Sequence, residues 1–362
     1  SIRIPGEAGL GLDEEGWMGE GSGMNRRAWL AGAGAGWIGG CVPFSGGGGG
    51  GTWNGRTLEL ADEMMRKSGC KGWAAWEGGS LEASWRTHES GPVMSITKSL
   101  AMLACVKAAG EGWLGAGEKV SETISEWRGD PGKERITVLM LLQMTAGLDE
   151  GVAALYRAKP RDKGAAAVAL PLRDEPGTAF RYGPACWEVL GEVLRRKCGA
   201  RGTDLEGFID AAVIRPVGLT RGNWKADGLG RRYLSTGAEA TVTGLGRLGR
   251  TLSELLNGRD AAGFKAADFA AMARTSSANP MFGGGLWRNR GGREIEVEES
   301  LDPPQGAGFW SGATMSRTQP SSMVALIGSA GQRVWIWPER ERVVVRLGYT
   351  PAWRDRPFLA VI

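Results

Sequence analysis

Residues 71–86 read KGWAAWEGGSLEASWR, and residues 332–347 read QRVWIWPERERVVVRL. The first stretch has a Gly-Gly pair at its centre, which is typical of a tight hairpin turn. The second is rich in β-branched and aromatic residues and is divided by Pro338 and the charged residues after it. Each stretch therefore predicts a β-hairpin. Because the two hairpins lie toward opposite ends of the chain, we expect an α+β fold in which both ends share one antiparallel sheet.

Four further stretches have apolar residues at the spacing of a helix with one buried face. A glycine follows each of them closely, as is common after the last turn of a helix. They are residues 56–68, 95–109, 135–144 and 185–197. We therefore expect helices to flank the sheet and a mostly helical region to be inserted between the two hairpins.

Composition excludes several classes of function. The chain has 362 residues, and its 16 Trp and 42% hydrophobic content are enough for a large core in spite of 60 Gly. A net charge of +4 without a basic stripe gives no reason to expect a nucleic-acid partner. The single histidine, His88, excludes His-rich metal sites and is the only imidazole available to a Ser-His-Asp triad. We expect no metal and no cofactor.

Ser95-Ile96-Thr97-Lys98, at the start of a predicted helix, is the first candidate for chemistry. Residues three apart share one face of a helix, so the Lys98 amine can reach the Ser95 hydroxyl. The start of a helix also carries partial positive charge where an oxyanion would form. A lysine among apolar groups can lose its proton and act as a base. Alone, the spacing is equally compatible with a capping serine followed by a solvated lysine.

Three further segments follow in order: RITVLMLLQMTAGL at 135–148, FRYGPACWEVLG at 180–191 and GSAGQ at 328–332. Together with Ser95 and Lys98, they make residues 56–350 resemble the serine β-lactamase-related superfamily. The resemblance is closest to the branch of class C β-lactamases, family VIII carboxylesterases, D-aminopeptidase-like enzymes and 6-aminohexanoate-oligomer hydrolases. It implies a β-lactamase/transpeptidase-like fold.

The resemblance also implies the roles of individual residues in acyl transfer. Ser95 would be the nucleophile that forms an acyl-enzyme, with Lys98 and Tyr182 as the general base. The backbone N–H groups of Ser95 and of Ser329, which follows Gly328, would form the oxyanion hole. The implied partner is a small-molecule ester or amide.

Two departures from the family pattern bear on the substrate. Pro184 stands where the family often has an asparagine, and Leu326-Ile327 precede Gly328 where β-lactamases have a lysine. The missing cation would pair with the carboxylate of a β-lactam or peptide. Both changes favour an esterase or amidase. A penicillin-recognising enzyme related to β-lactamases and D-Ala-D-Ala peptidases, and an inactive binding module on the same fold, are the alternatives.

Two tryptophans in Gly-rich surroundings, Trp287 and Trp310, are candidates for lining the substrate pocket together with Gly328. Packing in the core is the alternative role for both rings. Four cysteines in the expected folded domain would suffice for two disulfides, but their spacing decides no pairing.

The first part of the chain resembles an export signal. Residues 24–41 place Arg26 and Arg27 before a stretch of small residues that ends at Cys41, as in a bacterial lipobox. The alternative is a tail in which the arginine pair is a coincidence. We expect residues 1–23 to be an upstream or disordered segment, 42–55 a Gly-rich tether and 56–362 the serine hydrolase domain. The expected location is the periplasm of a bacterium, with a lipid on Cys41 as the only link to a membrane.

Overall fold

The computed structural model describes residues 53–290, 292, 295–297 and 309–362. The expected export signal, the lipidation at Cys41 and most of the tether lie outside the described residues. The account below concerns the compact unit Gly55–Ile362. Among its described helices, none has the length and apolar character needed to cross a membrane.

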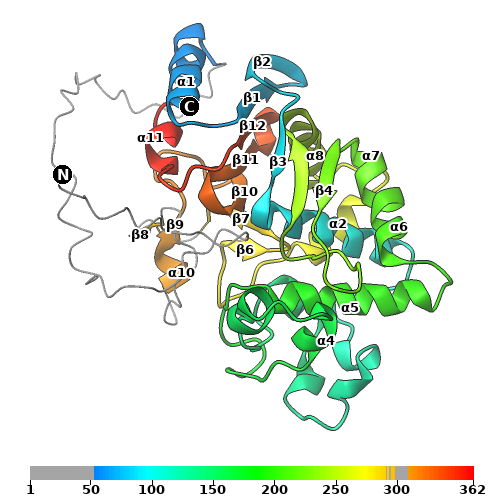
Figure 1. Ribbon diagram of the computed structural model, residues 1–362. Helices are drawn as coiled ribbons and strands as arrows, with labels where there is room; N and C mark the ends of the chain where they lie inside the picture. Colours follow the sequence, from blue (N-terminus) through cyan, green and yellow to red (C-terminus); the bar gives the residue numbers. More distant parts are fainter. Residues whose placement is uncertain (1–52, 291, 293–294, 298–308) are drawn as a thin grey trace, which may run out of the picture. The chain divides into compact units, whose positions relative to one another are not determined.

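A seven-stranded antiparallel sheet contains segments from both ends of this unit, which confirms the predicted fold class (Figure 1). Both predicted hairpins are present in it. In spatial order the strands are β2 (Ser80–Trp85), β1 (Gly72–Glu77), β12 (Arg342–Leu347), β11 (Gln332–Trp337), β10 (Val324–Gly328), β7 (Leu286–Arg288) and β6 (Phe282–Gly283). The pairing of β1 with β12 joins strands that are more than 260 residues apart in sequence, with Trp76 opposite Val343.

The two faces of the sheet differ in chemistry. In β11 and β12 every residue is buried, so helices must cover both faces. Val334 and Val343 point to the face covered by helix α8 (Val242–Leu256). On the opposite face, Trp335 stacks on Phe358 of helix α11 (Asp355–Leu359), with ring centroids 4.9 Å apart. That second face also carries buried arginines, and their partners include residues of the C-terminal segment.

Helix α8 packs directly on the strands at two glycines that face the sheet. A Cβ atom at Gly249 would lie 2.5 Å from Cγ1 of Val343, and one at Gly246 would lie 2.4 Å from the Trp76 ring. Real Cβ atoms do not approach neighbours this closely, so glycine is required for the observed packing distance.

The part of the chain between the two hairpins is mostly helical, as predicted, and some of its helices lie below the sheet in Figure 1. It also contains two small sheets. Besides α8 and α11, the helices are α1 (Gly55–Lys67), α2 (Thr97–Gly110), α3 (Val138–Leu142), α4 (Lys163–Val168), α5 (Ala185–Gly199), α6 (Leu205–Ile209), α7 (Arg215–Val217), α9 (Ala266–Met272) and α10 (Phe309–Gly312). The small sheets are β3 (Ser90–Pro92), β5 (Ala238–Thr241) and β4 (Arg221–Trp224), and the parallel pair β8 (Ile295–Glu296) and β9 (Ala313–Thr314).

The structure corrects one predicted helix and answers one open question. The helix predicted over 135–144 is only α3, Val138–Leu142, because Thr137 is extended and its side chain caps the helix by accepting a hydrogen bond from Met140 N at 3.3 Å. The four described cysteines are free thiols, all of them buried.

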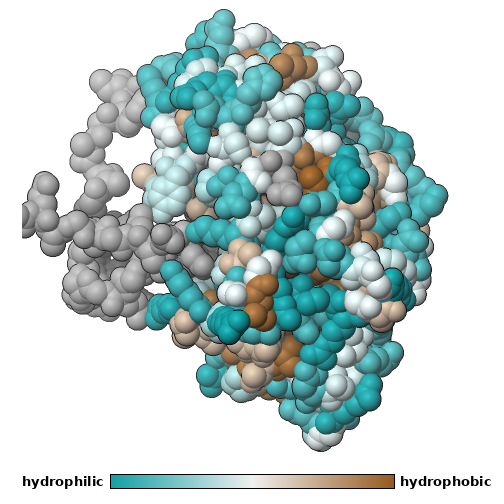
Figure 2. Space-filling model, turned by 45° about the vertical axis from the view of Figure 1, so that its right-hand side comes forward, coloured by the Kyte–Doolittle hydropathy of each residue, from teal (hydrophilic) through white to brown (hydrophobic). Residues whose placement is uncertain are grey.

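The face of the molecule in Figure 2 is mostly hydrophilic, and apolar residues are confined to small separate patches. The large apolar side chains that are exposed among the described residues lie apart in sequence: Leu60, Leu81, Leu229, Ile295 and Tyr349. Scattered exposed apolar residues of this kind are normal for a folded domain.

We predict that Gly249→Ala lowers the free energy of unfolding by about 1–3 kcal/mol, because the added methyl group overpacks the contact of α8 with Val343. Gly199→Ala is the matched control, since a Cβ at this helical glycine has no neighbour within 4 Å. We expect the control to change stability by less than about 0.5 kcal/mol. Urea denaturation measures both, and equal effects would contradict the close packing of α8.

Candidate active site

Ser95 lies in a single helical turn, Met94–Ile96, that leads directly into α2. Its side chain is half-buried. The residue before it, Met94, has a φ of +51°, a conformation that side chains other than glycine rarely adopt. Such strained positions cluster at functional sites, where the surrounding structure holds them in place.

Strand β5 holds this turn from both sides. Val93 N donates a hydrogen bond to Ala238 O at 2.9 Å, and Ala238 N donates to Thr97 Oγ1 at 3.2 Å. Thr97 Oγ1 in turn donates to Met94 O at 2.7 Å. Ser95 is thus fixed between two residues that are both bonded to Ala238.

Lys98 brings its amine to Ser95, as the sequence predicts. Lys98 Nζ lies 2.9 Å from Ser95 Oγ, and it also donates to the carbonyl oxygen of Ser235 at 2.7 Å. Only 2% of the lysine is exposed. The alternative of a solvated lysine is therefore wrong for this residue.

Tyr182 lies on the other side of the same amine. Its ring centroid is 5.0 Å from Lys98 Nζ, and the residue is half-buried just before α5. The structure therefore brings together the three side chains that the sequence analysis proposed as catalytic. Their chemical roles stay predictions.

The two candidate pocket tryptophans belong to an aromatic cluster that includes Tyr182. The Trp287 ring lies 5.8 Å from the Tyr182 ring and 5.7 Å from the Trp310 ring. Phe180 and Phe282 complete the cluster. Trp287 and Trp310 are buried, at 1% and 3% exposure, so they pack behind Tyr182 in this structure.

The Gly328–Ser329 segment, at the end of β10, lies against the turn that carries Ser95. A Cβ atom at Gly328 would lie 2.3 Å from Val93 O and 3.2 Å from Met94 Cβ. Only glycine permits this approach of β10 to the residues just before Ser95. Ser329 itself is exposed at the start of the hairpin turn.

The sequence analysis missed a buried carboxylate that fixes the partner of Lys98. Glu188 Oε1 accepts hydrogen bonds from Ser235 N at 3.0 Å and from Ser235 Oγ at 2.5 Å. Ser235 Oγ also accepts a hydrogen bond from the Tyr156 hydroxyl at 3.0 Å. Glu188 thus holds the residue whose carbonyl oxygen accepts from Lys98.

Burial raises the pKa of the Glu188 carboxyl above its ordinary value, and the charge of nearby Lys163 acts in the opposite direction. Lys163 is itself buried, with its amine 3.3 Å from the ring centroid of Tyr233 and 4.9 Å from that of Tyr156. No local motif signals this group, because its members come from separate segments of the chain.

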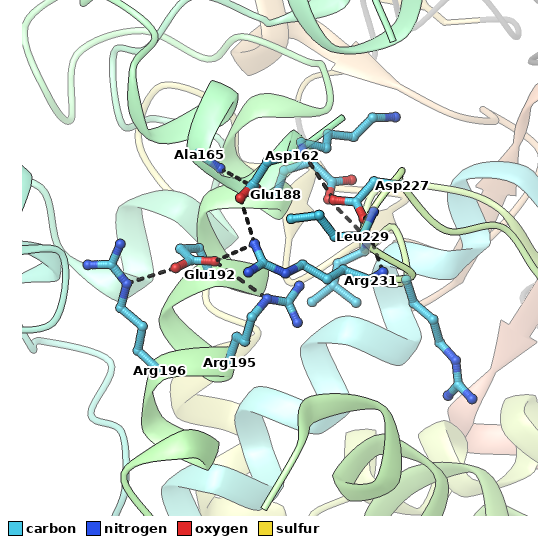
Figure 3. Close-up of polar contacts among 12 residues, drawn as sticks. Asp162, Ala165, Glu188, Glu192, Arg195, Arg196, Asp227, Leu229 and Arg231 are labelled. Carbon is cyan, nitrogen blue, oxygen red and sulfur yellow. Dashed lines mark hydrogen bonds and ion pairs between the residues drawn. The ribbon is translucent and has the colours of Figure 1, made fainter. Parts of the chain in front are cut away.

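Ion pairs hold the segment that precedes Ser235 against α4 and α5 (Figure 3). Arg231 Nη1 lies 2.9 Å from Asp162 Oδ2 and 3.9 Å from Glu192 Oε2. Asp227 caps the same segment by accepting hydrogen bonds from Leu229 N at 2.9 Å and Arg231 N at 3.0 Å. These contacts limit the movement of the Ser235 carbonyl relative to Lys98.

Among the described residues, no group of histidine, cysteine, aspartate and glutamate side chains is arranged to hold a metal ion. His88 is exposed in a turn after β2.

Comparison with known proteins agrees with this architecture. The family model described as Beta-lactamase matches residues 59–358. No curated protein sequence matches the chain.

Three similar solved structures cover most of the chain and share its fold. A putative beta-lactamase from Bacteroides dorei has a TM-score of 0.61 and 18% identity, and the match covers 82% of this chain and 91% of the Bacteroides protein. A putative 6-aminohexanoate-dimer hydrolase from Bacillus anthracis has a TM-score of 0.59 and 15% identity, and the match covers 80% of this chain and 76% of the hydrolase. EstCE1, a hydrolase with promiscuous acyltransferase activity, has a TM-score of 0.59 and 17% identity, and the match covers 82% of this chain and 93% of EstCE1.

We predict that Glu188→Gln changes how stability depends on pH. Because the folded protein raises the pKa of Glu188, the unfolded chain releases this proton first, near pH 4.3. The wild-type protein therefore loses stability relative to Glu188→Gln as the pH rises above about 4. Denaturant unfolding at several pH values measures this difference. Glu82→Gln is the control for losing one carboxylate, because Glu82 is exposed on β2. A wild-type protein that gains stability relative to Glu188→Gln as the pH rises would contradict the prediction.

Proposed function

The chain belongs to the beta-lactamase family, and from this premise we propose that it hydrolyses esters, and amides as a second class, through an acyl-enzyme on Ser95. The observation that carries the proposal is the buried Lys98 amine 2.9 Å from the Ser95 hydroxyl. The sequence has one histidine, His88, and its side chain is exposed. In this proposal the Lys98 amine and the Tyr182 phenol therefore act as the general base in place of an imidazole.

In acylation, Ser95 Oγ attacks the substrate carbonyl carbon while its proton passes to the base formed by Lys98 and Tyr182. A neutral Lys98 amine can accept this proton, since its Nζ lies 2.9 Å from Ser95 Oγ. The tetrahedral intermediate then expels the alcohol or amine, which receives the proton. Water, deprotonated by the same base, attacks the acyl-enzyme, and release of the acid restores Ser95.

Backbone N–H groups would stabilise the oxyanion. The Ser95 N–H belongs to the first turn of a helical segment, where N–H groups have no acceptor within the helix. The Ser329 N–H follows Gly328, which lies against Val93 and Met94. The two donors therefore belong to segments in direct contact, as an oxyanion hole requires.

The groups around Ser95 favour a substrate without a carboxylate. Leu326 is fully buried and Ile327 half-buried in the strand that leads to Gly328, so this part of β10 offers no cation. The aromatic cluster behind Tyr182 is apolar. These features support a neutral ester over a β-lactam, whose carboxylate would have no partner on this strand.

We predict that Ser95→Ala lowers the turnover of a short-chain aryl ester to less than about one thousandth of the wild-type rate, because the nucleophile is lost. Tyr182→Phe should lower kcat by about 10²–10⁴, the usual contribution of a general base. Ser84→Ala, at an exposed position of β2, is the control and should retain full turnover. Ester hydrolysis that persists in folded Ser95→Ala would refute the proposal and leave the binding-module alternative.

A further inference from the structure

The peptide that joins Gly328 to Ser329 is held from the side opposite its N–H group. The carbonyl oxygen of Gly328 accepts a hydrogen bond from Arg333 Nη1 at 2.8 Å. In a planar trans peptide, the C=O and the following N–H point in opposite directions. A side chain that fixes the Gly328 carbonyl therefore also fixes the direction of the Ser329 N–H.

Arg333 is itself rigidly placed. Its side chain has no exposed surface, and Nε lies 3.0 and 2.9 Å from the two carboxylate oxygens of Asp355. The Trp353 indole donates to Asp355 Oδ1 at 2.7 Å. Arginine suits this position because its planar guanidinium can bind a carboxylate and a carbonyl at the same time. Its Nη1 also donates to Gln332 O at 2.9 Å.

The turn between β10 and β11, Ser329–Gly331, is also held by donors from β12 and from the segment after it. Ala330, with a φ of +57°, accepts a hydrogen bond from Thr350 N at 2.8 Å through its carbonyl oxygen. The carbonyl oxygen of Gly331 accepts from Arg346 Nη1 at 2.7 Å. The carbonyl groups of residues 328, 330 and 331 are thus all occupied by donors of β11, β12 and the segment after β12.

We propose that Arg333, held by Asp355, is a positioning residue that orients the Ser329 N–H for the oxyanion of the reaction at Ser95. This inference rests on the proposed function. It assigns the C-terminal residues after β12 a role in turnover, because Asp355 binds the guanidinium of Arg333. Without the guanidinium, the peptide could rotate and turn its carbonyl oxygen toward the developing negative charge.

The test compares Arg333→Lys and Asp355→Asn with the control Arg342→Lys in the full chain. Arg342 is also a buried arginine of this sheet, 2.8 Å from Glu77, but it lies at the far end of the β11–β12 hairpin, about 13 Å along the strands. The measurements are kcat and KM for an aryl ester and the free energy of unfolding by urea.

We predict that Arg333→Lys lowers kcat by about 10–100-fold with KM little changed, because an oxyanion donor acts mainly in the transition state. Asp355→Asn should also lower kcat, by a smaller factor. Arg342→Lys should lose stability but keep its kcat. The Asp355→Asn arm keeps the test decisive if Arg333→Lys does not fold.

The outcomes separate the two claims. Wild-type kcat in folded Arg333→Lys, or in Asp355→Asn when Arg333→Lys does not fold, would overturn the positioning role and leave the proposed function intact. The positioning role would also be overturned if Arg342→Lys lowered kcat as much as Arg333→Lys does. A wild-type protein without Ser95-dependent ester hydrolysis would instead overturn the proposed function, and the positioning role with it.

Discussion

The buried amine of Lys98 is the group on which the arrangement of the candidate site depends. A polar group with 2% exposure must be satisfied inside the protein, and Ser95 Oγ and the Ser235 carbonyl both lie within hydrogen-bond distance of it. The Ser235 carbonyl can serve only if its residue is fixed. Glu188 fixes it through both the N–H and the hydroxyl, and the ion pairs of Arg231 hold the preceding segment. One amine therefore sets the relative positions of α2, α5 and the segment before β5.

A second constraint comes from the sheet. Gly328 allows β10 to approach within contact of Val93 and Met94, and so places the turn between β10 and β11 beside the segment that carries Ser95. The sheet can hold β10 there because both of its faces are covered, by α8 on one side and by α11 on the other. The pairing of the first strand with the last makes the site dependent on both ends of the domain.

Local patterns in the sequence predicted both hairpins, the α+β class and the pairing of Ser95 with Lys98, because each depends on residues close together in the chain. The helix at 135–144 was predicted too long, since Thr137 is extended and caps the N-terminus, so that the helix begins only at Val138. Glu188 and Arg333 went unnoticed for a different reason. Their partners, Ser235 and Asp355, are 47 and 22 residues away, and a buried charged residue has no pattern that distinguishes it from an exposed one.

The central claim is that Lys98 activates Ser95. Labelling of the folded chain with a fluorophosphonate, followed by mass spectrometry of the modified peptide, tests this claim most directly, since the reagent reacts with activated serines whatever the natural substrate is. The account predicts a label on Ser95 that is lost in Lys98→Ala. A folded wild-type protein without label, or a label on Ser95 that forms equally fast in Lys98→Ala, would contradict it.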